Sequence, residues 1–109
     1  MVQALKINEI KVGKITVSVW RDTQSAGYSD PRGHHDNFKI EVDSAQGWLC
    51  VGGGAKGSMY PGNFLTASFP ADDFGSWIIS SRDHINEDYT ALTGYAIGMK
   101  IDGGEVERL

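Results

Sequence analysis

The residues of this 109-residue chain that most resemble a cofactor site form a glycine-rich run, GGGAKGS at positions 52–58. A phosphate-binding loop needs its lysine directly before Ser or Thr, at the start of a helix. Here Lys56 precedes a glycine, and Pro61-Gly62 prevents a helix from following. The missing helix also excludes a dinucleotide fingerprint. We expect these glycines to let a strand bulge or pass close under a ring before a loop opens, the alternative being a ligand-admitting loop.

Two other groups resemble metal ligands. His34, His35 and Asp36 are consecutive, and neighbouring residues on a strand point to opposite faces, whereas zinc needs three or four converging ligands. We expect a solvated loop leading into a strand there, and no metal, unless a meeting of two loops adds His84.

The second group is acidic. It comprises Asp72, Asp73, Asp83, Glu87 and Asp88. Their spacing fits no EF-hand, so solubility and helix capping explain them and no cofactor is expected, with an irregular calcium site as the alternative.

Support for catalysis is weak. Ser80, Ser81, Asp83 and His84 fall within five residues, but the members of a catalytic triad converge from distant segments. The nucleophile-elbow motif Gly-x-Ser-x-Gly is absent, and a small sandwich has little room for a deep cleft. The single cysteine, Cys50, lies in an apolar run, where a buried, inert thiol is expected. We therefore predict no catalytic residues and no enzyme activity.

Aromatic and polar residues between the apolar runs suggest a binding site instead. Sugars are recognised by a flat ring together with converging polar groups, and Tyr28 and Tyr60 lie in glycine-containing loops. Trp48 and Trp77 stand in apolar runs and are expected in the core. A hairpin of 64–69 and 77–80 would bring the loops before and after it to one end. The predicted ligand-binding residues are Tyr60, Asn63, Arg82, Asp83, His84 and Asn86. The alternative is structural, with Asp83 capping a turn and His84 bonding a carbonyl.

Alternation of apolar and polar residues predicts the strands that position these groups. It occurs at 15–20, 38–43 and 95–101, and shorter apolar runs at 48–51, 64–69 and 77–80 indicate covered strands. Positions 5–10 fit a strand or a helix. Turns are expected at 12–14 and 70–75. The side chains expected to be buried between two sheets are Ile15, Val17, Val19, Phe38, Ile40, Val42, Ile97 and Met99.

The pattern as a whole predicts one all-β domain over 1–109, an antiparallel β-sandwich of jelly-roll or immunoglobulin-like type. At most one short helix is expected, near 85–92, because Ile85, Tyr89 and Leu92 have helical spacing. Its N-cap would be Asn86 or Asp83. The runs 51–55, 65–70 and 95–101 resemble stretches of small bacterial β-modules of unassigned role, a resemblance that gives no residue a function.

Charge narrows the class of partner. Ten Lys and Arg against 14 Asp and Glu give a net charge of −4, and the one basic cluster, Lys6, Lys11 and Lys14, is interrupted by Glu9. This composition argues against nucleic acid and anionic membranes as partners. No apolar run has the length of a membrane span, and the chain as given shows no export signal, so we expect a soluble protein without a predicted location.

The sequence therefore predicts a non-catalytic binding module, lectin-like, that binds a carbohydrate or another cell-surface ligand. The first alternative is a structural or assembly module that forms homo- or hetero-oligomers through strand edges and aromatic patches. A small hydrolase is the third class.

Overall fold

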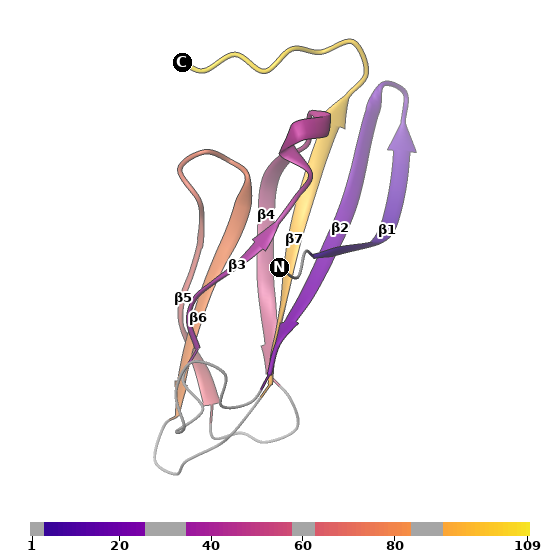
Figure 1. The fold of residues 1–109 in the computed structure, drawn as a ribbon. Helices are drawn as coiled ribbons and strands as arrows, with labels where there is room; N and C mark the ends of the chain where they lie inside the picture. Colours follow the sequence, from indigo (N-terminus) through magenta and orange to yellow (C-terminus); the bar gives the residue numbers. More distant parts are fainter. Residues whose placement is uncertain (1–3, 26–34, 58–62, 84–90) are drawn as a thin grey trace.

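A computed structural model of the chain consists of two antiparallel sheets that pack face to face (Figure 1). It describes residues 4–25, 35–57, 63–83 and 91–109. One sheet has the strand order β1-β2-β7-β4 and the other β3-β6-β5. The strands are β1 (Leu5–Val12), β2 (Ile15–Gln24), β3 (His35–Glu41), β4 (Leu49–Gly57), β5 (Asn63–Pro70), β6 (Ser76–Asp83) and β7 (Leu92–Ile101). The predicted all-β sandwich is confirmed.

The order of the strands distinguishes this sandwich from two common ones. A constant-type immunoglobulin domain also divides its strands into four and three, with chain-order sheets 1-2-5-4 and 3-6-7. Here β7 lies between β2 and β4, and β5 lies beside β6, so the fifth and seventh strands have exchanged places. A jelly roll has eight strands. The sandwich therefore keeps the immunoglobulin division with a different connectivity.

Both predicted turns join neighbouring strands. Gly13, with φ of +60°, lies in the turn between β1 and β2, a backbone conformation that glycine adopts without strain. In the turn between β5 and β6, the Asp73 carboxylate accepts a hydrogen bond from the Gly75 N–H at 2.9 Å. A side chain that bonds its own turn is the behaviour expected for this Asp-rich segment.

Several strands extend further than the sequence suggests. Residues 5–10 form strand β1 rather than a helix, and β4 continues through the glycine run to Gly57. A short 3-10 turn covers Ser44–Gln46. Leu92, expected at the end of a helix, begins β7, and Asp83, an expected N-cap, ends β6. The rest of the predicted helix, 85–90, lies outside the described residues.

The core lies between the two sheets. Its buried apolar members are Trp20, Ile40, Val42, Trp48, Cys50, Ile79, Leu92 and Ala96. The rings of Trp20 and Trp48 meet edge to face, with centroids 4.9 Å apart and planes at 77°. Trp48 is thus a core residue as predicted, whereas Trp77 is half-buried and packs against the core.

The buried face of β2 and β7 is the opposite of the predicted one. Ser18, Trp20, Ala96 and Gly98 face the core, so their alternating partners Ile15, Val17, Val19, Ile97 and Met99 lie on the outer face of the sheet. In and directly after β3 of the other sheet, Ile40 and Val42 are buried as expected, and Phe38 is half-buried against the core. The alternation was correct, but the prediction of which face is buried was wrong for this sheet.

The size of the side chains explains this reversal. On β7, a Cβ atom at Gly98 would overlap the Trp20 ring, and one at Gly94 would overlap Ile40. The small residues of β7 thus leave the space that large rings and aliphatic chains from other strands fill. Core packing depends on complementary volume as well as on apolarity.

Candidate ligand-binding site

The strand ends next to three chain connections gather at one end of the sandwich (Figure 1). These connections lead from β2 to β3, from β4 to β5 and from β6 to β7. The cross-strand partners at this end are Gln24 with Leu92, Gly57 with Leu92, His35 with Ser81, and Asn63 with Asp83. Both sheets therefore contribute to one end, which we call the connection end.

The predicted site residues belong to this end as far as they are described. Asn63 and Asp83 are backbone partners in the β5–β6 hairpin, so the hairpin brings the two chain segments together as expected. Arg82 and Asp83 lie in β6 rather than in a loop, and Asn63 begins β5. Tyr60, His84 and Asn86 lie outside the described residues, as does Tyr28.

Arg82 is the predicted ligand-binding residue whose side chain is described. Its Nη2 lies 3.5 Å from the Asp36 carboxylate, and both side chains are about half exposed. An ion pair of this length in solvent contributes little to stability. A guanidinium and a carboxylate held side by side at a surface can donate and accept hydrogen bonds with a ligand that carries hydroxyl groups.

His35 contradicts the expectation of a solvated loop residue. It begins β3 and is completely buried, with its Nδ1 2.6 Å from the Gln24 side-chain oxygen. Because an amide oxygen only accepts, Nδ1 is the donor in this bond. Its cross-strand neighbour Ser81 is also fully buried. Across the described ranges, no group of three His, Cys, Asp or Glu side chains could hold a metal ion.

The acidic residues do not form one site. Asp72 and Asp73 lie in the β5–β6 turn, whereas Asp83 ends β6 at the connection end. At ~3.3 Å per residue, the strand between them is on the order of 25 Å long. Glu87 and Asp88 lie outside the described residues.

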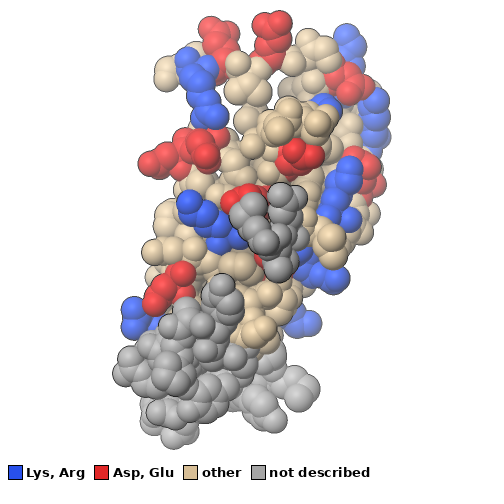
Figure 2. Space-filling view, in the orientation of Figure 1, with Lys and Arg blue, Asp and Glu red and all other residues tan. Residues whose placement is uncertain are grey.

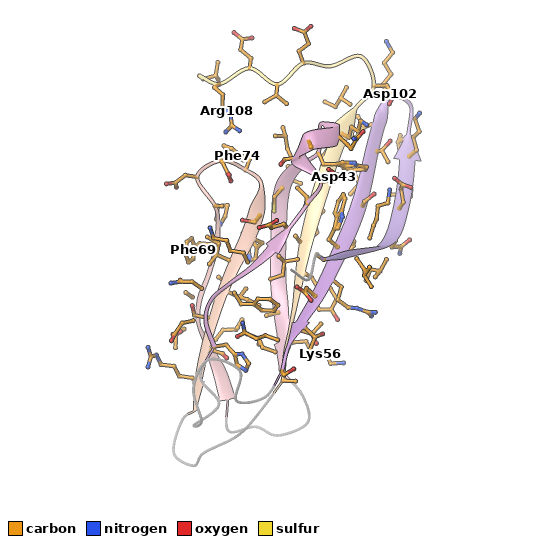
Figure 3. The ribbon with its side chains drawn as sticks, viewed as in Figure 1. Asp43, Lys56, Phe69, Phe74, Asp102 and Arg108 are labelled. Atoms are coloured by element: carbon orange, nitrogen blue, oxygen red, sulfur yellow. The ribbon has the colours of Figure 1, made fainter. Side chains whose placement is uncertain are left out.

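A cleft at the opposite end was missed by the sequence analysis. It has a volume of about 520 Å³ and lies over the outer face of β3, β6 and the β5–β6 turn. Lining side chains include Lys39, Glu41, Phe69, Asp72 and Ser76. Phe69 is 41% exposed and extends away from the sandwich (Figure 3). The sequence placed Phe69 in a strand covered on both faces, which concealed its role in a surface cleft.

The C-terminal segment borders this cleft. Nη2 of Arg108 donates to the Asp73 carbonyl oxygen at 2.9 Å, and Figure 3 shows Arg108 extending toward the turn that carries Phe74. This bond fixes the end of the chain across the top of the sandwich, so the turn and the C-terminal segment form one rim.

Two of the three lysines in the basic cluster, Lys6 and Lys11, lie on β1 and are paired with acids. Lys6 lies 3.3 Å from Glu9, and Lys11 lies 2.6 Å from Asp102. The Lys11 ammonium, by hydrogen bonding and charge, lowers the pKa of Asp102 below its ordinary value. Figure 2 shows Lys and Arg interspersed with Asp and Glu over the described part of the visible face. No helix in the described parts of the chain is long and apolar enough to cross a membrane.

Comparison with protein-family models, with curated proteins and with solved structures finds no match to this chain.

Proposed function

We propose that this protein is a non-catalytic binding module that recognises a glycan or another hydroxyl-rich cell-surface ligand at the connection end. The observation that carries the proposal is that the strand ends next to three chain connections lie at one end of a two-sheet scaffold. Sandwich proteins that bind through loops use this arrangement, because rigid strands hold variable segments side by side.

The composition of the three connections supports a ligand of this kind. Each connection contains one tyrosine: Tyr28, Tyr60 and Tyr89. Tyrosine offers a flat apolar ring and a hydroxyl group with few rotatable bonds, which suits binding surfaces. Arg82 and Asp36, on the strands that border the connections, add a donor and an acceptor. Rings and paired polar groups together are what a sugar requires.

A glycan array probed with labelled protein is the first experiment. The three tryptophans are unsuitable as reporters, because Trp20 and Trp48 are core residues and Trp77 donates its indole N–H to Ser68 at 2.9 Å. Titration calorimetry with a glycan identified on the array then measures the affinity. Failure of the array to identify any ligand would contradict the proposal.

Variants at the two ends locate the site. Tyr60→Ala, Asp83→Ala and Arg82→Ala should each weaken glycan binding about tenfold or more, with unchanged melting temperatures. Phe69→Ala, in the cleft at the other end, is the matched control and should leave binding intact. If Phe69→Ala alone loses glycan binding, the binding site lies in the cleft and not at the connection end. A lowered melting temperature with intact binding in Asp83→Ala would give this residue a structural role only.

A further inference from the structure

The outer face of the β1-β2-β7-β4 sheet carries aliphatic side chains in register. Direct cross-strand partners point to the same side of a sheet, so the pairing defines rows across it. The first row is Val12, Ile15 and Ile101; the second is Ile10, Val17, Met99 and Leu49; the third is Asn8, Val19, Ile97 and Gly52. We call these three rows the aliphatic face. Asn8 is its one polar member, and none of its members is charged.

The aliphatic face is open to solvent. Ile10 and Val12 are 64% and 71% exposed, and Ile15, Ile97 and Ile101 are between 37% and 46% exposed. Val51, in the bulge of β4 beside the third row, is 51% exposed. These fractions correspond to an apolar surface on the order of 600 Å², at the upper end of what monomers expose and close to the ~800 Å² that each partner buries in a standard interface.

The C-terminal segment extends this surface at one margin. Val106 and Leu109 line a groove of about 390 Å³ together with Leu49, Met99 and Ile101, and Glu105 and Glu107 place two carboxylates at its margin. Val106 is itself half exposed. The groove adds apolar area next to the first two rows, which brings the exposed surface nearer to the size of a standard interface.

One edge of the same sheet, strand β1, is protected against pairing with another strand. Lys6, Glu9 and Lys11 of the edge strand β1 lie opposite Trp20, Ser18 and Thr16, on the inner side of the sheet. Glu9 accepts a hydrogen bond from the Ser18 hydroxyl at 3.1 Å and pairs with Lys6. Inward-pointing charges on an edge strand oppose the addition of another strand. Addition of a strand is therefore disfavoured at the β1 edge, next to the aliphatic face.

We propose that the aliphatic face binds a second copy of this chain, so that two sandwiches pack sheet to sheet as a two-fold dimer. An uncharged face of aliphatic side chains offers a charged or strongly polar partner nothing to pair with, whereas a second identical face matches it in polarity and extent. A two-fold contact buries the same patch on both copies, and two sheets pack ~10 Å apart with interdigitated side chains. This inference does not depend on the glycan proposal.

Light scattering after size exclusion, together with sedimentation velocity, tests the dimer on the full chain at about 100 µM. We expect a mass of about 24 kDa, twice the 11.9 kDa of one chain. The double variant Ile10→Lys/Ile97→Lys should elute as a monomer, with a dissociation constant raised at least tenfold. Leu65→Lys, on the other sheet and 43% exposed, is the matched control and should remain dimeric.

A second double variant tests the dimer in case the lysine substitutions prevent folding. Val17→Thr/Val19→Thr keeps side-chain shape and strand propensity while adding two hydroxyl groups, and should weaken the dimer with an unchanged circular dichroism spectrum. A monomeric wild type overturns the proposal. If that monomer floats with phosphatidylcholine vesicles, the face belongs to a lipid surface. A dimer that survives both double variants, or that Leu65→Lys dissociates equally, overturns it as well.

Discussion

The indole ring of Trp77 lies against the backbone of Gly53, so that a Cβ atom at position 53 would overlap the ring and come within 2.5 Å of the Tyr95 carbonyl oxygen. Trp77 belongs to one sheet and Gly53 to the other. The close contact allows the two sheets to approach each other at this point. The glycine run of β4 therefore has a packing role.

Replacement of Gly53 by alanine tests this role. We expect Gly53→Ala to lower the free energy of unfolding by about 1–3 kcal/mol or more, because the added methyl group displaces the Trp77 ring. Gly54→Ala is the matched control, since a Cβ there meets nothing within 4 Å. The control should be neutral or stabilise by up to ~1 kcal/mol through the unfolded chain. Urea denaturation measures both, and equal effects would contradict the explanation.

Two neighbouring serines should respond to alanine with opposite signs. The Ser81 hydroxyl is buried and has no hydrogen-bond partner among the described residues, so Ser81→Ala should stabilise the fold by about 1 kcal/mol. The Ser80 hydroxyl accepts a hydrogen bond from the Asn37 N–H at 2.9 Å, so Ser80→Ala should destabilise by about 1–3 kcal/mol. Thermal unfolding of both variants provides the measurement. The interpretation fails if Ser81→Ala is the more damaging of the two.

The thiol of Cys50 should be unreactive in the native protein. Its side chain is 1% exposed, and burial raises its pKa above the ordinary value of 9.0. Alkylation at pH 8 should therefore proceed only as fast as the protein opens, and become rapid in urea. The thiol ionises at lower pH in the unfolded chain, so native stability should decline as the pH rises beyond about 9. Cys50→Ala should remove this decline, and fast alkylation of the native protein would refute the prediction.

The ion pair of Lys11 and Asp102 should be visible in a titration. Lys11 lowers the pKa of Asp102, mainly through a hydrogen bond of 2.6 Å, and Lys100 adds a smaller effect of the same sign. Because the pKa of Asp102 is lower in the folded state than in the unfolded chain, the ion pair stabilises the folded state at pH values above the pKa of the unfolded chain. This stabilisation is lost as the pH falls through the pKa of the folded state.

Carboxyl chemical shifts from NMR give the Asp102 pKa directly. Lys11→Met should raise it toward 3.8, and Lys100→Met should raise it less. Equal shifts in the two variants would show that distant charge rather than the hydrogen bond sets the pKa.

The sequence alone determined most of the strands, the two hairpin turns and the sandwich class. Alternation with period two is a local property, and so is the turn chemistry of Gly13 and Asp73, because each depends on the residue's own backbone and neighbours. The hairpin of 64–69 and 77–80 also followed from local information, since two strands of similar length joined by a short turn must bring their far ends together, and Asn63 and Asp83 are partners at those ends.

Only the tertiary structure decided which face of the β1-β2-β7-β4 sheet is buried. Both faces of β2 carry apolar residues, and hydrophobicity favoured Val17 and Val19 over the face of Trp20 and Ser18. The decision rests on volume: Trp20 fills the space that Gly98 leaves on β7 and meets Trp48 across the core. Such complementarity joins residues far apart in the chain, so no local pattern contains it, and it left the aliphatic face exposed to solvent.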